Sequence, residues 1–347
     1  MLSSGSVCPK AERLNSPVVA VSGSIAYDHI MSFGGSFGDH IIPEKTHVIS
    51  LSFLVDSLKK QRGGVAGNVC YSLALLGSPS LLIGAAGEDF DSYAETFTAL
   101  GIDLTYVLRA TDTLTASAFM MADQKDNHIA SFFPGPASRA TAIDVLPIGN
   151  RCSYAIVGAT APEVMTQHVA QFGASAARLI FDPAFQIILL TPEELVVGMQ
   201  HSWGIVSNDY EFAMIERKTG LSVSNIAEKV ELVVVTYGEK GSELISGGSS
   251  VRVPAAPIDT VVDPTGAGDA YRSGLIKGLL LGPDLQITGR IAGLTAAYAV
   301  EHVGTQAHEY TIPEFKERFD QSFPDYAGAI NEIDFHSESM PLTLSHQ

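Results

Sequence analysis

Residues 263–270 read DPTGAGDA, and the chain continues as YRSGLIKGLLLG through residues 271–282. In the second segment Tyr271, Leu275 and Leu279 recur every four residues, which places their side chains on one face of a helix. Glycines come directly before that helix. The stretch therefore predicts a tight turn that opens into a helix.

This turn has the composition of an anion-binding site. Gly266 and Gly268 lack Cβ atoms, so successive backbone N–H groups can converge on one anion, and the helix dipole adds positive potential there. Asp269 follows at once. A capped loop is the alternative, because aspartate is common at helix starts. A carboxylate beside an anion is costly unless it has a role, such as accepting a proton from an attacking hydroxyl, which favours a catalytic base.

Toward the N-terminus, short β-branched runs alternate with helix-like segments. This alternation is typical of a mostly parallel sheet, so we expect a three-layer α/β/α core. Ligands bind such sheets at the carboxyl ends of the strands, which makes the polar residues there candidates for the site. The runs expected as strands are residues 18–21, 81–86, 154–159, 179–182, 204–207 and 232–236.

Two segments, residues 31–62 and 113–134, break this alternation and have the character of added strands. The second predicts a hairpin that turns at Asp126 and Asn127. We expect the two segments to form one small β-sheet lid over the crevice. The remaining divisions are an N-terminal extension over residues 1–16, a core from residues 17–30, 63–112 and 135–325, and a loosely attached C-terminal tail over residues 326–347.

The composition excludes several classes of protein. Of the 347 residues, 46% are hydrophobic and 17% are charged, so the chain can bury a core and is not disordered as a whole. Lys and Arg total 21 against 38 Asp and Glu, and the net charge of −17 disfavours nucleic acid and anionic membranes as partners. The three cysteines are dispersed and no apolar run is long enough to span a membrane, so we expect a cytoplasmic protein.

Two further motifs follow or precede expected elements of the core. In RGGVAGN, residues 62–68, Gly63 and Gly64 let a ligand approach the backbone, and the Asn68 amide can donate to and accept from a polyol. A tight loop capped by Asn68 is an equally supported alternative. Asp28, shortly after the first strand, can accept hydrogen bonds from two neighbouring hydroxyls, although one carboxylate is weak support by itself.

These three motifs, in this order and spacing, resemble the ribokinase-like (PfkB) family of carbohydrate and nucleoside kinases over about residues 17–312. DPTGAGDA is the most specific element. NDYE at residues 208–211 resembles the NxxE element of the family, and residues 236–241 resemble its nucleotide loop. Within the family, GSIAYDHIM, RGGVAGN, ASFFPG and EHVGTQ are most similar to bacterial, mycobacterial-type adenosine kinases.

The resemblance implies a nucleoside site in which Asp28 holds the ribose 2′ and 3′ hydroxyls and Phe132 stacks on the purine. The sequence departs from the mycobacterial pattern at Ala118, where that pattern has an aromatic residue, and Phe119 should point to the other face of its strand. This departure removes a basis for strict discrimination among purines. The other residues implied at the nucleoside are Ser24, Gly63, Gly64 and Asn68.

For the phosphate donor, the resemblance implies that Asp269 takes the proton from the 5′ hydroxyl as it attacks the γ-phosphoryl group of ATP. Glu211 would organise Mg²⁺ through water, and Asp263 would lie near a monovalent cation such as K⁺. Arg272 either reaches the phosphates or forms a surface ion pair. The other residues implied are Gly266, Ala267 and Gly268 for the anion and Asn208, Thr236, Gly238 and Gly241 for ATP.

The sequence therefore predicts an ATP- and Mg²⁺-dependent adenosine kinase of purine salvage that makes AMP and ADP. A ribose, inosine or guanosine kinase of the same family is one alternative, and a non-catalytic nucleoside-binding regulatory protein is another. The apolar lid residues Ile49, Leu51 and Phe53 predict an exposed patch. By the resemblance we expect a homodimer that pairs lid to lid, with the Ser52 region of one subunit near the nucleoside site of the other.

Overall fold

The computed structural model describes residues 18–41, 50–125 and 127–336. The strands of its main sheet are β1 Val18–Ser22, β4 Ser80–Ala86, β5 Val107–Arg109, β8 Cys152–Val157, β9 Arg178–Phe181, β10 Gly204–Asn208, β11 Leu232–Thr236, β12 Ser242–Ser246 and β13 Ser249–Val253. They form a nine-stranded sheet in the order β13-β12-β11-β10-β9-β8-β1-β4-β5. Every neighbouring pair from β11 to β5 is parallel, and β12 is antiparallel to β11 and β13. The predicted mostly parallel sheet is confirmed.

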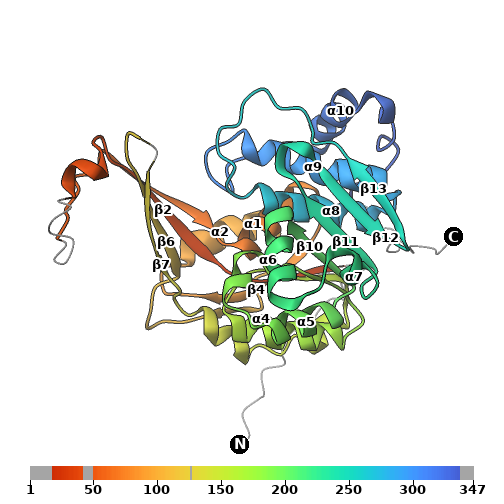
Figure 1. Ribbon diagram of the computed structural model, residues 1–347, viewed down its shortest axis with the longest axis horizontal. Coiled ribbons are helices and arrows are strands. Elements are labelled where there is room, and N and C mark those ends of the chain that lie inside the picture. Colours follow the sequence, from red (N-terminus) through yellow and green to blue (C-terminus); the bar gives the residue numbers. More distant parts are fainter. Residues whose placement is uncertain (1–17, 42–49, 126, 337–347) are drawn as a thin grey trace, which may run out of the picture.

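Helices cover both faces of this sheet, which gives the predicted three-layer core (Figure 1). One face carries α1 Val65–Leu75, α2 Asp91–Ala99, α8 Ala267–Leu281 and α9 Leu285–Val300. The other carries α3 Leu146–Gly149, α4 Pro162–Gly173, α5 Pro192–Gln200, α6 Asp209–Thr219 and α7 Val223–Ala227. Along β1, Val19 and Val21 join the first cluster and Ala20 the second, as the alternation of side chains across a strand requires.

A smaller sheet projects from the core (Figure 1). Its strands, in the order β3-β2-β6-β7, are β3 Ser57–Gly63, β2 Ala26–Ser32, β6 Ala116–Ala122 and β7 His128–Phe133. The two segments that break the core pattern do combine into one sheet. The predicted boundary at residue 31 is wrong, however, because β2 pairs with β3 and β6 from Ala26 onward.

The C-terminal part of the described chain is packed, contrary to the expected loose attachment. After α10 Ile312–Ser322, which packs on α9, Ile330 and Phe335 are buried, and Lys277 Nζ in α8 donates to the Phe335 carbonyl at 2.6 Å. The burial of Ile330 and Phe335 could not be predicted from the sequence, because the two residues are separated by polar ones and form no apolar pattern. The remaining one-turn helices are η1 Phe37–His40, η3 Ala137–Ala142, η4 Ala184–Ile188, η5 Gly238–Lys240 and η6 Pro324–Tyr326.

The outer part of the small sheet differs in detail from the prediction. Phe53 packs against Phe33, Phe37 and His40 in one aromatic cluster and so is not part of an open patch. Leu51 is exposed. Ile49, Asp126 and the N-terminal extension lie outside the described residues. Within residues 18–41, 50–125 and 127–336, no helix has the length and apolar character needed to cross a membrane.

Candidate active site

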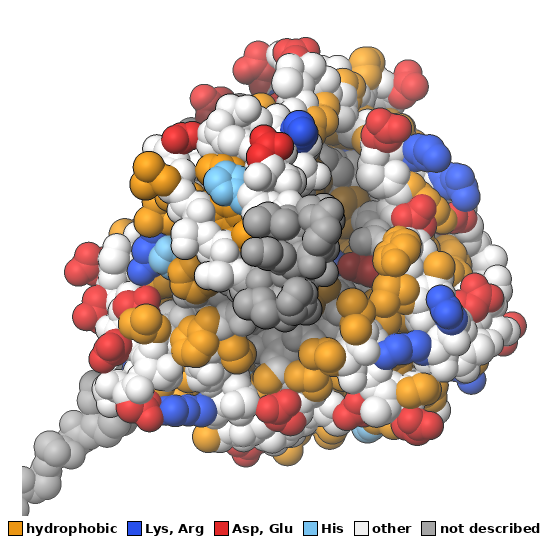
Figure 2. Space-filling model, turned by 60° about the vertical axis from the view of Figure 1, so that its left-hand side comes forward, with side chains coloured by type: hydrophobic (Ala, Val, Ile, Leu, Met, Phe, Trp, Pro, Cys, Tyr) orange, Lys and Arg blue, Asp and Glu red, His pale blue; other side chains and the backbone are white. Residues whose placement is uncertain are grey.

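The larger candidate cavity, of about 740 Å³, lies at the carboxyl ends of the parallel strands, where the small sheet joins the core. Figure 2, which brings the small sheet forward, shows a hollow with acidic atoms at its floor and hydrophobic side chains along its rim. This position follows the general rule for open parallel sheets. The predicted site residues that line it are Ser24, Asp28, Gly64, Asn68, Phe132, Gly266 and Asp269.

The turn before α8 separates this cavity from a second one of about 290 Å³. Gly266 caps α8 with a φ of +81°, and Asp269 lies in the first turn of the helix. Gly266 and Asp269 line the larger cavity, whereas Ala267 and Gly268 line the smaller one. Two ligands bound on either side would meet at the positive end of the helix dipole. The other predicted residues at the smaller cavity are Thr236, Gly238 and Gly241.

Amide side chains hold Asp269. Asn68 Nδ2 donates to Asp269 Oδ2 at 2.8 Å, and Gln306 Nε2 donates to Asn68 Oδ1 at 3.0 Å. Burial raises the pKa of Asp269 above its ordinary value, while Arg272 and the Asn68 hydrogen bond act against this shift and Glu211 adds to it. A fixed carboxylate with a raised pKa is a better proton acceptor for a hydroxyl than a free carboxylate.

Arg272 forms a buried ion pair below the turn. Its Nη2 donates to Asp182 Oδ1 at 2.5 Å, and both side chains are almost fully buried. A Cβ atom at Gly268 would lie 2.5 Å from Arg272 Nη1, so the guanidinium passes directly beneath the anion-binding turn. The predicted surface ion pair is wrong, because this pair is buried: a fully buried carboxylate needs a cationic partner, and Asp182 engages Nη2 of the guanidinium. The contact of Arg272 with the phosphates stays a prediction.

Asp28, Ala118 and Phe132 lie side by side across three strands of the small sheet. Asp28 pairs with Ala118, and Ala118 pairs with Phe132. Phe132 is 76% exposed at the cavity and no aromatic ring lies beside it at Ala118. The adjacent Phe119 stacks on His29 with ring centroids 4.6 Å apart, on the opposite face, as predicted. The aromatic side chains that this sheet contributes to the cavity lining are therefore Phe132 and its neighbour Phe133, both in β7.

The glycines of RGGVAGN allow close approach of the backbone. Gly64 has a φ of +87°, and a Cβ atom there would lie 2.6 Å from a backbone nitrogen of β2. A Cβ atom at Gly63 would collide with the Asp28 carboxylate. Ser24 Oγ accepts from the Val65 N–H at 3.0 Å, so it ties the first turn of α1 to the end of β1.

Asn208 and Glu211 form a reciprocal cap at the start of α6. Asn208 Oδ1 accepts from the Glu211 N–H at 2.8 Å, and Glu211 Oε2 accepts from the Asn208 N–H at 2.9 Å. Neither residue lines the two cavities, although Glu211 is near enough to raise the pKa of Asp269. The capping role accounts for their spacing by itself. Ser52 is exposed and lines neither cavity.

Asp263 ties the anion-binding turn to the loop before α10. Its Oδ1 accepts from the Thr265 N–H at 2.9 Å and its Oδ2 from the Gly304 N–H at 3.0 Å. In the described part of the chain, no three His, Cys, Asp or Glu side chains are grouped so that they could hold a metal ion. Mg²⁺ at this site would therefore take most of its ligands from nucleotide phosphates and water, its usual arrangement in phosphoryl transfer.

Comparison with known proteins identifies the family. The model of the pfkB family carbohydrate kinases matches residues 28–312, a span that holds the smaller cavity, the turn before α8 and all residues that line the larger cavity except Ser24 and Ala26. This chain belongs to the PfkB family of carbohydrate kinases. The family resemblance of its motifs is thereby confirmed, and the two-cavity arrangement has the form that a kinase with separate acceptor and donor sites requires.

This PfkB kinase is similar to two nucleoside kinases and, in its fold, to a ribokinase. A nucleoside kinase of Methanothermobacter thermautotrophicus is 30% identical over 272 residues, which cover 77% of this chain and 87% of the relative. The structure of the Burkholderia thailandensis nucleoside kinase in complex with ADP-inosine is 34% identical, with a TM-score of 0.79, and covers 94% of this chain and 100% of that chain. Arabidopsis thaliana ribokinase complexed with ribose and ATP is 19% identical with a TM-score of 0.69 over 88% of this chain and 99% of that chain, and shows the fold.

Several residues of the site belong to no motif that predicts a role for them. Gln306 lies within EHVGTQ, a segment used only as a family resemblance, and Asp182 follows a predicted strand as one polar residue among several. Their partners Asn68 and Arg272 are 238 and 90 residues away along the chain. Other residues of this kind at the larger cavity include Val65, Phe133, Phe185, Gln186, Leu189 and Thr305.

Proposed function

We propose that this PfkB kinase transfers the γ-phosphoryl group of ATP to the 5′ hydroxyl of a nucleoside, with adenosine as the preferred acceptor. The observation that carries the proposal is the turn of residues 264–268 with Asp269, which forms the wall between an acceptor-sized cavity and a second cavity. The similarity to the Burkholderia nucleoside kinase supports a nucleoside as the acceptor.

In the proposed reaction Asp269 accepts the proton of the 5′ hydroxyl as that oxygen attacks the γ-phosphorus. Asn68 keeps one carboxylate oxygen of Asp269 in place. The backbone N–H groups of Gly266 and Gly268 face the developing charge on the phosphoryl oxygens, while the Ala267 N–H already donates to Pro264 at 3.3 Å. Asp28 binds the ribose hydroxyls and Phe132 stacks on the base, so the 5′ carbon is directed toward α8.

Mg²⁺ and a monovalent cation belong to the proposal as counter-charges. Mg²⁺ neutralises charge on the phosphates during transfer. Glu211 keeps Oε1 without a hydrogen bond from the described residues, since Oε2 is engaged by Asn208, so Oε1 can accept from water around the metal. Each carboxylate oxygen of Asp263 accepts a hydrogen bond from one backbone N–H, and each retains a lone pair for a cation such as K⁺.

The proposal extends to a cytoplasmic homodimer of purine salvage that pairs through the small sheet. Leu54, which precedes β3, and Leu58 in β3 are 89% and 63% exposed, and this pair of exposed leucines near Ser52 supports a covering partner. Sedimentation at micromolar protein is expected to give a dimer. A monomer under those conditions would remove this part of the proposal.

The first test is phosphoryl transfer from Mg-ATP to adenosine, inosine, guanosine, ribose and fructose. We expect the highest kcat/KM with adenosine, lower values with the other purine nucleosides and little turnover with free sugars. Phe132→Ala should lower kcat/KM for nucleosides by about 10- to 100-fold, because base stacking contributes about 1–3 kcal/mol, and should leave ribose unaffected. Turnover with ribose or fructose alone would overturn the nucleoside assignment.

Nucleoside binding is expected to weaken as the pH falls through about 6. Burial, with the carboxylates of Asp269 and Asp263 nearby, raises the pKa of Asp28 to about 6. An ionised carboxylate can accept both ribose hydroxyls, and this form is lost by protonation near pH 6 instead of near 4. Titration with adenosine between pH 5 and 8 measures the dissociation constant. Asp28→Asn should bind weakly with a flat profile, and a wild-type midpoint near pH 4 would contradict this role.

A further inference from the structure

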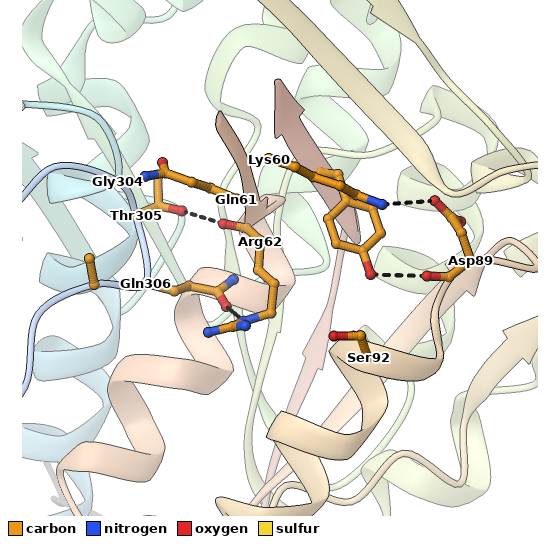
Figure 3. Close-up of a pocket in the computed structure, with 10 residues that line it drawn as sticks. Lys60, Gln61, Arg62, Asp89, Ser92, Gly304, Thr305 and Gln306 are labelled. Carbon is orange, nitrogen blue, oxygen red and sulfur yellow. Dashed lines mark hydrogen bonds and ion pairs between the residues drawn. The ribbon is translucent and has the colours of Figure 1, made fainter. Parts of the chain in front are cut away.

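A separate cavity of about 380 Å³ is lined by residues of β2 and β3, by the segment that leads into α2 and by the loop before α10 (Figure 3). Successive side chains of β2 point to opposite faces, so Tyr27 lines this cavity while Asp28 lines the active-site cavity. The polar side chains of the separate cavity come from β3, from the start of α2 and from the loop before α10: Lys60, Gln61 and Arg62; Asp89 and Ser92; Thr305 and Gln306.

The positive charges at this cavity are notable in a chain of net charge −17. Lys60 is already partnered, since its Nζ lies 3.4 Å from Asp89 Oδ2 and 3.6 Å from the centre of the Tyr27 ring. Asp89 is committed as well, because Oδ1 accepts from the Thr115 N–H at 2.8 Å. These pairings leave Arg62 as the cation without a carboxylate partner among the residues that line the cavity.

Arg62 presents its terminal nitrogens for a ligand. Its Nε donates to Gln306 Oε1 at 3.3 Å, and within the described residues no hydrogen bond from Nη1 or Nη2 is seen. In Figure 3 the Ser92 hydroxyl points toward the side of the cavity that carries Arg62. Guanidinium nitrogens without a partner and a hydroxyl that line the same cavity are donors from which an oxyanion can accept.

Arg62 is joined to Asp269 by hydrogen bonds of one consistent polarity. Asn68 Nδ2 donates to the Asp269 carboxylate at 2.8 Å, which leaves Asn68 Oδ1 as an acceptor. Gln306 Nε2 donates to that oxygen at 3.0 Å, which leaves Gln306 Oε1 to accept from Arg62 Nε. Gln306 Nε2 also lies 3.0 Å from Tyr93 Oη, which donates to the Gly63 carbonyl. If the oxygen and nitrogen of either side-chain amide, Asn68 or Gln306, exchanged places, at least two of these hydrogen bonds would be lost.

We propose that this cavity binds a small oxyanion, a carboxylate or a phosphate group, at Arg62 and Ser92. The bound oxyanion would restrict the motion of the hydrogen-bonded side chains of Arg62, Gln306 and Asn68, the last of which holds Asp269. The effect on nucleoside binding rests on the proposed function, whereas the anion site itself does not. An occupant fixes the free end of Arg62. If these side chains are already ordered, less conformational entropy is lost when a nucleoside binds beside Asn68. Each ligand therefore raises the affinity of the protein for the other.

The anion site is tested first, without nucleoside or ATP. Acetate, followed by ¹H line broadening, and orthophosphate, followed by ³¹P line broadening, are titrated into the wild-type protein at constant ionic strength. We expect binding of acetate, phosphate or both that Arg62→Gln reduces by at least about tenfold and Ser92→Ala by a few-fold. Arg217→Gln, which removes an exposed arginine of α6 remote from the cavity, is the matched control and should bind as the wild type does.

The two probes distinguish the sources of the oxyanion. Acetate binding alone indicates a carboxylate ligand, and phosphate binding that depends on Arg62 indicates a phosphate ligand. Phosphate that binds equally well to Arg62→Gln occupies the turn before α8 and counts against the proposal, as does the absence of binding by either probe. Melting curves of each variant confirm that the loss is not unfolding.

The coupling is tested second, by titrating adenosine with and without the saturating probe. We expect the dissociation constant of adenosine to fall about fivefold in the wild type. Gln306→Leu removes the hydrogen bonds between Arg62 and Asn68 but leaves the terminal nitrogens of Arg62 and the Ser92 hydroxyl in place, so it should retain probe binding while losing this change. Gln306→Met, also uncharged and of similar size, should give the same result. Equal coupling in the wild type and in Gln306→Leu would overturn the role of the chain. Probe binding without any adenosine binding would contradict the proposed function and leave the anion site standing.

Discussion

Replacing Asp269 with asparagine is expected to lower kcat by about 10²- to 10⁴-fold, the range that a positioned general base contributes. The amide can still accept from Asn68 Nδ2, so the arrangement around residue 269 is retained and only the proton acceptor is lost. The dissociation constant for the nucleoside should change little. Steady-state kinetics with Mg-ATP and adenosine, together with adenosine titration, measure the two effects separately.

A second readout in the same variant reports on the electrostatics. The Asp269 carboxylate is one of the causes of the raised pKa of Asp28, so its removal should move the pH midpoint of adenosine binding downward. Asp325→Asn, at an exposed aspartate far from the cavities, is the control and should alter neither quantity. Unchanged turnover in Asp269→Asn would rule out Asp269 as the base.

Gly266→Ala is the second change with a large expected effect. Residue 266 has a φ of +81°, and an added Cβ atom would lie 2.9 Å from Thr305 Cβ and Cγ2, so the turn must shift. Displacement of the N–H groups that face the phosphoryl oxygens should lower kcat by about 10²- to 10³-fold, as the loss of one such donor does elsewhere. The same kinetic assay measures this loss.

Gly220→Ala separates backbone strain from damage to the site. Gly220 ends α6 with a φ of +74°, and nothing lies within 4 Å of the Cβ atom that alanine would add. The positive φ should lower the free energy of unfolding by about 1 kcal/mol in both variants, and the contact with Thr305 adds to this loss in Gly266→Ala alone. Only Gly266→Ala should lose turnover. Equal kinetic losses in the two variants would show that the turn has no special part in catalysis.

Six of the seven parallel strands in the described main sheet could be predicted, because they are largely buried on both faces and read as apolar runs, as in residues 232–236. Strands without that property were missed. The β12–β13 hairpin is built from SELIS and SSVRV, in which serine and charged residues alternate with apolar ones, and β5 has only three residues. Ala26 was placed in the core for a related reason. Nothing in the local sequence marks the point at which the polypeptide leaves β1 of the main sheet and enters β2 of the small sheet.

The site was predictable where its residues are contiguous and not where they meet through the fold. The turn with Asp269 is local, so its glycines and carboxylate could be interpreted together. Arg272 shows the limit, because helical spacing gives the side of α8 on which it lies but not the buried Asp182 beneath it. Gln306 reaches Asn68 only after the loop before α10 folds against α1, and no spacing in the sequence expresses that contact.

The carboxylates in and near the larger cavity also bear on the end of the reaction cycle. Asp28, Asp263 and Asp269 lie near enough to one another for the latter two to raise the pKa of Asp28. An uncharged acceptor enters this acidic surrounding without repulsion, whereas a phosphomonoester carries nearly two negative charges at neutral pH. The same groups that bind the acceptor would then repel the product, so that departure of the monophosphate is favoured once the metal and the spent nucleotide have left.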